Sequence, residues 1–229
     1  MLTIHDARLP EPIIQTLRLS GRCIVFFTTN ITYQAIAGHP DIFFCKTPNQ
    51  WIIAPNLPKK YKEILSLNLI PYKEGKTNVG EKYPEAASYN AVVTNDYLIH
   101  RIDITEPEIL NNCPNLNKIN VNQGFTKCSL LALKNNYFIT CDEGIYKTLI
   151  KNNINLLLLS SKEILLQGHE YGFLGGCCGI WKNNLFILGS LHNYIDASKL
   201  KKFTELLGYT IIELYDGPLF DGGTILFME

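Results

Sequence analysis

The sequence carries no excess of either charge. Its 229 residues include 21 lysines and arginines and 21 aspartates and glutamates, so the formal net charge at pH 7 is zero. Proteins that hold nucleic acids or other polyanions do so through clustered lysine and arginine side chains. The charge balance therefore argues against a general nucleic-acid binder, and we expect no nucleic acid among the partners.

Long apolar runs are also missing. No segment approaches the roughly 18 consecutive apolar residues that a membrane-spanning helix needs. The N-terminal residues, Met1 to Asp6, lack the basic segment followed by an apolar one that is typical of a secretory signal. We therefore expect a cytoplasmic protein that does not associate with a membrane.

The seven cysteines lack the spacing of a disulfide framework or of a zinc site. Their number is odd, and no Cys-x-x-Cys pair occurs. The adjacent Cys177 and Cys178 would point to opposite faces of a strand, which is poor geometry for chelation. In a reducing compartment such residues are mostly free thiols, buried as small apolar side chains. We therefore expect free thiols and no metal site.

The composition is ordinary for a folded protein. Hydrophobic residues make up 46% of the chain and charged residues 18%, and the length is sufficient for a large core. No linker or low-complexity segment divides the sequence. We interpret residues 1–229 as a single domain.

Asparagine-containing dipeptides recur between apolar stretches at nearly regular intervals. They begin at residues 49, 95, 135 and 183, which are 46, 40 and 48 residues apart. Asparagine tolerates the left-handed backbone conformation of tight hairpin turns. A further 46 residues lead from 183 to 229, so a fifth turn would fall where the two ends of the chain meet. A fixed period of this length indicates a repeat architecture.

Each turn lies within the same predicted order of elements: a strand, the hairpin turn, a return strand, a helix and a last strand. The strands before the turns are predicted at 41–45, 87–94, 126–133, 174–181 and 223–228, and the return strands at 51–54, 97–102, 137–140, 185–188 and 2–4. The helices are predicted at 11–19, 59–67, 106–112, 143–152 and 198–207, and the last strands at 23–27, 69–72, 118–121, 156–159 and 210–214. Asp142 and Asp196 are suitable helix-start residues. The N-terminal strand completes the fifth unit.

This repeat predicts a closed α/β architecture. A unit with one apolar sheet face and one helix cannot bury its core alone, whereas five units in a ring can. The sequence therefore predicts a five-fold pseudosymmetric α/β propeller, with five ββαβ units closed by the N-terminal strand. The alternative is a mixed α/β sheet whose regular turns are accidental.

Three short motifs lie at or near the entries to the first strands of different repeats: Gly124-Phe-Thr-Lys-Cys128, His39-Pro-Asp41 and Asp221-Gly-Gly-Thr224. Together with the five-fold repeat they resemble the pentein fold of the guanidine-modifying enzymes, which include arginine deiminases, dimethylarginine dimethylaminohydrolases and amidinotransferases. In that family a nucleophilic cysteine follows a glycine-rich segment, a histidine occurs in His-x-Asp, and a glutamate opens Glu-Gly-Gly-Asp. The cyclic order of acid, histidine, one intervening repeat and cysteine is similar here, with the chain opened at a different repeat.

The sequence also departs from the family pattern. Asp221 stands in place of the glutamate, Thr224 in place of the second acid, and Cys128 lies in the middle of the chain rather than near its C-terminus. The fourth repeat, at residues 172–179, lacks the additional aspartate with which the hydrolases grip a guanidinium group. These differences affect the expectation of a guanidino substrate more than the expectation of the fold.

The resemblance implies a cofactor-independent cysteine hydrolase or transferase that acts on C–N bonds of a small guanidino or amidine substrate. Cys128 would be the nucleophile, His39 the general acid and base, and Asp221 would orient His39 or share in substrate binding. The candidate substrate-binding residues are Asp41, Asn90 and Gly124. Two carboxylates are useful because a carboxylate can hold a planar cation through paired hydrogen bonds.

Each motif also has an ordinary structural interpretation. Cys128 could be a buried apolar thiol, and the segments containing His39 and Asp221 could be simple turns. The competing functions are a non-catalytic pentein-fold binding protein, as the ribosome anti-association factors of that fold are, and a degenerate enzyme that senses a metabolite. Convergence of Cys128, His39 and Asp221 at one channel mouth would favour the enzyme.

Overall fold

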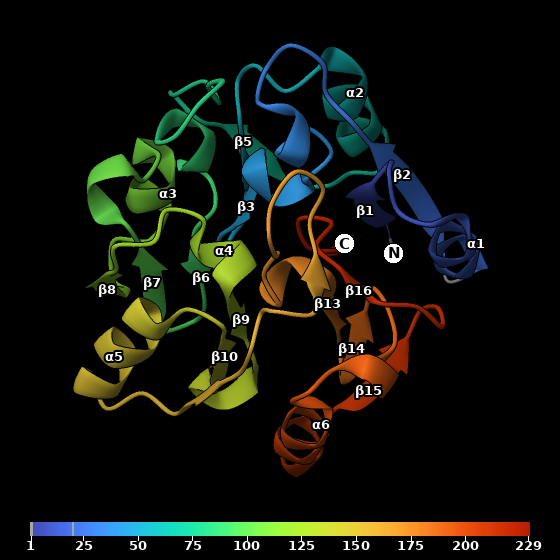
Figure 1. Ribbon diagram of the computed structural model, residues 1–229. Coiled ribbons are helices and arrows are strands. Elements are labelled where there is room, and N and C mark those ends of the chain that lie inside the picture. The colour runs from blue at the N-terminus through green and yellow to red at the C-terminus, as the bar shows by residue number, and fades with distance from the viewer. Residues whose placement is uncertain (1, 20) are drawn as a thin grey trace.

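The computed structural model describes residues 2–19 and 21–229, which form five small sheets around a central axis (Figure 1). Each sheet has three strands with the same topology: an antiparallel hairpin, followed by a third strand that pairs in parallel after a helical crossover. The sheet orders are β17-β1-β2, β3-β4-β5, β6-β7-β8, β9-β10-β11 and β13-β14-β15. The predicted α/β propeller of five ββαβ units is therefore confirmed.

The inner strands of the five units lie nearest the axis, and β3 contacts β6, β6 contacts β9, and β13 contacts β17. They are β3 (Phe44–Lys46), β6 (Val92–Val93), β9 (Leu130–Ala132), β13 (Cys178–Trp181) and β17 (Leu226–Met228). The middle strands are β4 (Trp51–Ile53), β7 (Tyr97–His100), β10 (Phe138–Thr140), β14 (Asn184–Ile187) and β1 (Leu2–Asp6).

The outer strands and the helices surround these strands. The outer strands are β5 (Tyr72–Glu74), β8 (Asn117–Asn120), β11 (Leu156–Leu158), β15 (Thr210–Glu213) and β2 (Arg22–Phe26). The helices are α2 (Lys59–Leu67), α3 (Pro107–Asn112), α5 (Glu143–Lys151), α6 (Ala197–Leu206) and α1 (Glu11–Leu19), and they lie on the outside of the ring. A short parallel pair, β12 (Ile164–Leu165) with β16 (Leu219–Phe220), joins two connecting segments.

The predicted turns and helix starts have a clear local basis. Asn135 and Asn136 both have positive φ, at 58° and 57°, which is the conformation that a tight hairpin turn requires. Asp142 occupies the N-cap of α5, where its carboxylate accepts a hydrogen bond from the Ile145 amide at 2.8 Å. Asp196 also occupies an N-cap, but its carboxylate accepts from the Ser160 amide at 2.7 Å instead.

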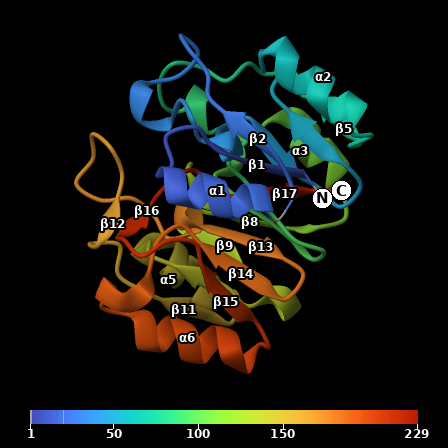
Figure 2. The ribbon, with the colours of Figure 1, turned by 90° about the vertical axis from the view of Figure 1, so that its right-hand side faces the viewer.

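The ring is closed by the two ends of the described chain. Strand β1 pairs antiparallel with β17, with Leu2 opposite Met228, and the labels of the two termini lie side by side in Figure 2. Helix α1 buries Ile13 and Leu17 in a cluster that includes Ile225, next to β17 of the same unit, and Phe186 of the neighbouring unit. Burial of this apolar surface holds the first and last parts of the chain together.

The first strand of each unit is shorter than predicted. In four of the five units, a single helical turn lies at or just before the start of the predicted strand. These turns are η2 (Pro40–Ile42), η3 (Glu85–Ala87), α4 (Thr126–Ser129) and η6 (Gly175–Cys177). The prediction of a strand over 69–72 was also wrong in most of its range, since Leu69 has a φ of 56° and β5 begins at Tyr72. The helical turns matter for function because they present side chains to one end of the channel.

None of the helices within residues 2–19 and 21–229 is long and apolar enough to cross a membrane.

Candidate active site

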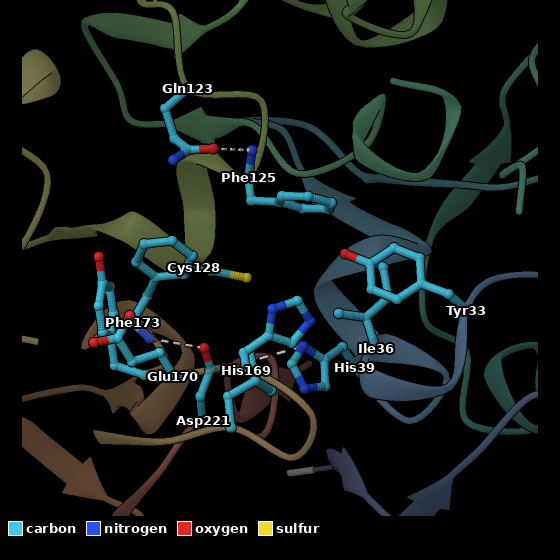
Figure 3. Close-up of a pocket in the computed structure, with 12 residues that line it drawn as sticks. Tyr33, Ile36, His39, Gln123, Phe125, Cys128, His169, Glu170, Phe173 and Asp221 are labelled. Carbon is cyan, nitrogen blue, oxygen red and sulfur yellow. Dashed lines mark hydrogen bonds and ion pairs between the residues drawn. The ribbon is translucent and has the colours of Figure 1, made fainter. Parts of the chain in front are cut away.

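A cavity of about 400 Å³ opens at the end of the channel where the inner strands begin (Figure 3). Its lining includes Cys128, His39 and Asp221 together with aromatic rings. One imidazole nitrogen of His39, one carboxylate oxygen of Asp41 and the Cys128 sulfur all lie within 4.8 Å of one another. The structure therefore brings together side chains from the first, third and fifth units at one mouth of the channel.

Cys128 lies in the helical turn α4, not on a strand. Its backbone N–H donates to Asn90 Oδ1 at 3.2 Å, and the Lys127 N–H donates to the same oxygen at 2.7 Å. The Asn90 amide group in turn donates to the Cys128 sulfur at 3.4 Å and to the Asp41 carbonyl at 3.2 Å. Asn90 thus fixes the turn and orients the thiol.

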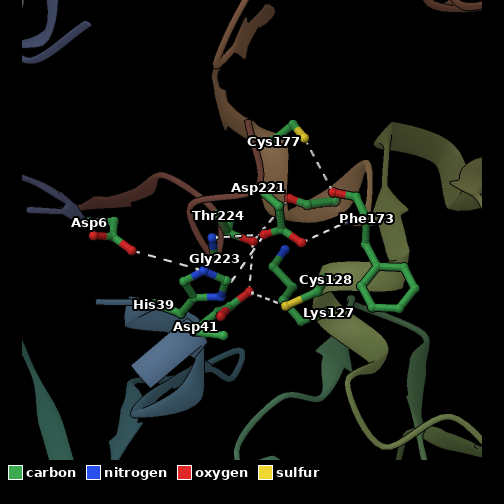
Figure 4. Close-up of polar contacts among 12 residues, drawn as sticks. Asp6, His39, Asp41, Lys127, Cys128, Phe173, Cys177, Asp221, Gly223 and Thr224 are labelled. Carbon is green, nitrogen blue, oxygen red and sulfur yellow. Dashed lines mark hydrogen bonds and ion pairs between the residues drawn. The ribbon is translucent and has the colours of Figure 1, made fainter. Parts of the chain in front are cut away.

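Asp41 is the acid in direct contact with the thiol. The Cys128 Sγ–H donates to Asp41 Oδ2 at 3.1 Å, and the Thr224 hydroxyl donates to the same oxygen at 2.9 Å (Figure 4). The other carboxylate oxygen, Oδ1, is buried and has no hydrogen-bond partner among the described residues. Asp41 therefore has one oxygen engaged by the protein and one without a donor.

The environment of Cys128 favours the thiol over the thiolate. Burial raises its pKa well above the usual value, and the charges of Asp41 and Asp221 raise it further. The hydrogen bond from Asn90 acts in the opposite direction but is a smaller effect. In the free protein Cys128 is therefore protonated at neutral pH, and a nucleophilic role requires a change in its surroundings when a ligand binds.

His39 lies between two buried carboxylates. Its Nε2 is 3.9 Å from Asp6 Oδ2, and its Nδ1 is 4.0 Å from Asp221 Oδ1 (Figure 4). Within the described part of the chain neither ring nitrogen has a hydrogen-bond partner. Asp6 is itself paired with Arg8, whose Nη2 lies 2.5 Å from Asp6 Oδ2. Both imidazole nitrogens are thus without a donor or acceptor among the described residues, and an acid lies near each of them.

Asp221 is held by a tight glycine turn. Its two oxygens accept hydrogen bonds from the Phe173 N–H at 2.9 Å and from the Gly223 N–H at 3.1 Å. Gly223 has a φ of 66°, and a Cβ at that position would lie 2.2 Å from the His39 Cβ, so a side chain cannot be accommodated there. Burial raises the pKa of Asp221, and His39 and the two N–H donors oppose this effect.

The charged groups around the sulfur are mostly acidic. Asp41 and Asp221 are 0% and 1% exposed, and no ion pair with a lysine or arginine engages either carboxylate among the described residues. None of the described residues that line the cavity is a lysine or an arginine. Buried carboxylates are costly without a counter-charge, so this site is suited to a cation.

The predicted substrate-binding residues occupy different positions. Asp41 and Asn90 are fully buried beneath the thiol and do not line the cavity, and neither does Gly124. The carbonyl of Gly124 interacts with His100 Nε2 at 2.8 Å, and its Cα faces the Tyr83 ring. Asp41 is close enough to reach a ligand at the sulfur, whereas Asn90 acts by positioning Cys128.

Sequence reasoning missed several residues of the site. Asp6 lies just beyond the predicted closing strand at residues 2–4, and no local motif distinguishes it. Tyr33, Phe125 and Phe173 form much of the apolar wall in Figure 3, but aromatic residues in loops carry no specific sequence signal. Burial raises the pKa of Tyr33 to about 12, with smaller contributions from Cys128 and Asp221.

His39, Asp41 and Cys128 also form a set that could hold a metal ion. Histidine, cysteine and aspartate are all ligands of Zn²⁺. The Cys128 sulfur already donates to Asp41, so a metal would have to displace the thiol proton. The sequence-based expectation of no metal stays a prediction.

The fold is that of the guanidino-group-modifying enzymes of the pentein class. An agmatine deiminase from C. jejuni with substrate bound is similar over 95% of this chain and 90% of its own, with a TM-score of 0.57 and 11% identity. The dimethylarginine dimethylaminohydrolase from Pseudomonas aeruginosa complexed with citrulline covers 93% of this chain and 91% of its own, with a TM-score of 0.51 and 11% identity. The amidinotransferase SxtG from Microseira wollei covers 93% and 87%, with a TM-score of 0.52 and 12% identity.

At the level of sequence, residues 4–226 match a family model described as a family of unknown function (DUF6873), and the chain belongs to that family. No curated protein sequence matches this chain significantly. The likeness to the solved structures, at 11–12% identity for the three enzymes compared, therefore establishes the shared architecture. The chemistry has to be argued from the site itself.

Proposed function

We propose that the protein is a cofactor-independent cysteine hydrolase or transferase that acts on a C–N bond of a small guanidino or amidine compound. The observation that carries this proposal is the position of Cys128 in contact with Asp41 and near Asp221, two buried carboxylates that form no ion pair with a lysine or arginine among the described residues. A planar cation bound by Asp41 and Asp221 would supply the missing positive charge. It would also place an electrophilic carbon beside the sulfur.

Binding of the cation is the event that activates the thiol. Burial, and then the charges of Asp41 and Asp221, hold the Cys128 pKa high in the free protein. A bound amidinium group neutralises these charges and favours the thiolate. The sulfur then attacks the amidinium carbon and forms an S–C bond, while the thiol proton passes to His39.

His39 completes both half-reactions. The tetrahedral adduct expels an amine, which receives the proton from His39, and leaves an amidino group bound to Cys128 through sulfur. In hydrolysis, water gives a proton to His39 and attacks the same carbon; the S–C bond breaks, and the sulfur recovers the proton. In transfer, a second amine takes the place of water. Both sequences balance without a cofactor.

The cavity favours a substrate without a carboxylate group. Its lining contains acidic groups and aromatic rings, and no lysine or arginine contributes to it among the described residues. Glu170 stands at the exposed part of the lining, where it would repel a carboxylate and attract an amine. Agmatine, an amine with a guanidino group, fits this pattern better than arginine, which differs from agmatine only by its carboxylate.

The test is a comparison of agmatine with arginine on wild-type protein. We expect release of ammonia or an amine from agmatine, and intact-mass spectrometry after an acid quench should show an amidino adduct on Cys128. Cys128→Ala should abolish both signals and change stability by no more than about 1–2 kcal/mol. Cys141→Ala, at a thiol outside the cavity, is the matched control and should retain both. Turnover by Cys128→Ala would refute the mechanism.

One observation favours a second function, binding without catalysis. Cys128 is 3% exposed and its thiol donates to Asp41, which is an arrangement that stabilises the protonated, unreactive form. A pentein-fold protein that senses a cation would bind agmatine in a calorimetric titration but would give no product and no adduct. The same acid-quench experiment therefore separates the two functions.

A further inference from the structure

A second cavity, the far-end cavity, lies along the inner strands β3, β9, β13 and β17 and reaches Lys46 and Ala132, the last residues of β3 and β9. Its volume is about 200 Å³, and its lining includes residues of β9, β13 and β17. A smaller space of about 70 Å³ adjoins it and shares Lys46, Trp51, Lys127 and Leu226. None of the residues that form the candidate active-site cavity borders either space.

Two lysines line both spaces, and neither forms an ion pair with another described residue. The Lys46 Nζ lies 5.3 Å from the centre of the Trp51 ring. Burial raises the pKa values of Cys45 and Cys178, and the Lys127 charge opposes this effect at both thiols, so the ammonium group lies near two different inner strands. Both lysine side chains thus line the same two spaces.

A buried donor without an acceptor belongs to Trp51, which also lines both spaces. Trp51 is 4% exposed, and its indole N–H has no hydrogen-bond partner among the described residues. Buried polar groups in folded proteins almost always have a partner, so an unpaired indole N–H at a cavity wall requires an explanation. An oxygen atom of a ligand in the cavity would provide the acceptor.

The remainder of the lining is largely apolar, with Leu131, Ile180, Ile225 and Phe227 among its residues. The volume is below the range of about 300–1,000 Å³ that is usual for drug-sized ligands. No aspartate or glutamate lines the cavity among the described residues. Burial lowers the pKa of Lys46, and the charge of Glu229 opposes this larger effect.

We propose that this far-end cavity binds a small organic carboxylate with a short apolar chain. The carboxylate group accepts hydrogen bonds from the two ammonium groups and from the Trp51 indole, and the chain packs against the leucine, isoleucine and phenylalanine side chains. Charge-assisted contacts of this kind hold the anion. This site is distinct from the proposed catalytic site and does not depend on the function assigned there.

The experiment is isothermal titration calorimetry of the full chain with hexanoate and with hexanamide, its neutral isostere. We expect hexanoate to bind at one site and to bind at least about tenfold more tightly than hexanamide, since a hydrogen bond to a charged group is worth at least that factor. Lys46→Gln and Lys127→Met should each weaken hexanoate binding about tenfold, and Trp51→Phe should weaken it by a smaller factor. Lys182→Gln is the matched control, because the Lys182 Nζ also lies over a tryptophan ring, at 5.9 Å from the centre of Trp181.

Three results would overturn the proposal. They are the absence of hexanoate binding, equal affinity for hexanamide, and equal loss of affinity in the Lys182→Gln control. If Lys127→Met does not fold, Lys46→Gln alone decides, because Lys46 is exposed and its replacement leaves the core intact. Hexanoate should still bind to the wild-type protein when agmatine is present, because the two sites are separate.

Discussion

Replacing Asp41 with asparagine should make the Cys128 thiol more acidic in the free protein while weakening cation binding. Asp41 Oδ2 lies 3.1 Å from the sulfur, and both side chains are almost completely buried. The negative charge of Asp41 therefore opposes formation of the thiolate. An asparagine of the same shape removes this charge, and its amide group can donate to the sulfur.

The size of the effect follows from Coulomb's law. At 3.1 Å and an effective dielectric constant of about 20, two unit charges repel one another by about 5 kcal/mol. Even a quarter of this energy corresponds to about a tenfold change in the ratio of thiolate to thiol. We therefore expect Asp41→Asn to raise the rate constant for alkylation of Cys128 by iodoacetamide at least about tenfold near pH 8.

The assay is time-resolved alkylation followed by peptide mass spectrometry. Cys23 and Cys141 are partly exposed and provide reference rates in the same samples. Asp103→Asn, at a carboxylate outside the cavity that pairs with Arg101, is the matched control and should leave the Cys128 rate unchanged. Equal Cys128 rates in wild type and Asp41→Asn would refute the role assigned to the Asp41 charge.

Four further predictions concern Asp221, Thr224 and the closure of the ring. Burial raises the pKa of Asp221, so this carboxyl group ionises at a higher pH than a free aspartate. Calorimetry should therefore show that agmatine binds more tightly as the pH rises from about 4 to 7. An Asp221→Asn variant with the same pH profile would contradict this. The raised pKa also means that protonated Asp221 stabilises the folded protein below about pH 4. This stabilisation is lost as the pH rises through the pKa of Asp221 in the folded protein. The melting temperature of wild type relative to Asp221→Asn should therefore fall as the pH rises. Thr224→Val removes the hydrogen bond to Asp41 and should lower the free energy of unfolding in urea by about 1 kcal/mol, and no change would show that this contact is not stabilising. Ile4→Ala, in the fully buried closing strand, should lower the free energy of unfolding by about 2–5 kcal/mol in the same assay. The control Leu19→Ala, at a side chain that is 90% exposed, should lower it by no more than about 0.5 kcal/mol. Similar losses of stability in the two variants would argue against closure of the ring by β1.

The repeat could be predicted from the sequence because its signals are local. At one of the predicted turns asparagine adopts the left-handed conformation, as Asn135 and Asn136 show, and helices α1 and α2 have the predicted bounds. These features depend on backbone preferences and apolar spacing within about ten residues. The regular spacing of the turns then determined the number of units.

The helical turns before the inner strands could not be predicted, because they depend on contacts between units. The segment Thr126–Ser129 is followed by an apolar run that favours a strand, yet the side chain of Asn90 from the neighbouring unit binds the amides of Lys127 and Cys128 and fixes a turn. Tertiary hydrogen bonds of this kind override local propensity. The role of Asp6 is hidden for the same reason, since its proximity to His39 arises only when the ring closes.

The most direct test of the central claim, that the site binds a planar cation beside Cys128, compares two alkylating reagents of the same shape. Chloroacetamidine is cationic and chloroacetamide is neutral, and the labelling rate of Cys128 with each is divided by the rate for a free thiol such as N-acetylcysteine. The account predicts a normalised rate at least about tenfold higher for the amidine, because its contacts with buried carboxylates are charge-assisted. It also predicts that Asp41→Asn removes this preference. Equal normalised rates for the two reagents in the wild-type protein would contradict the claim.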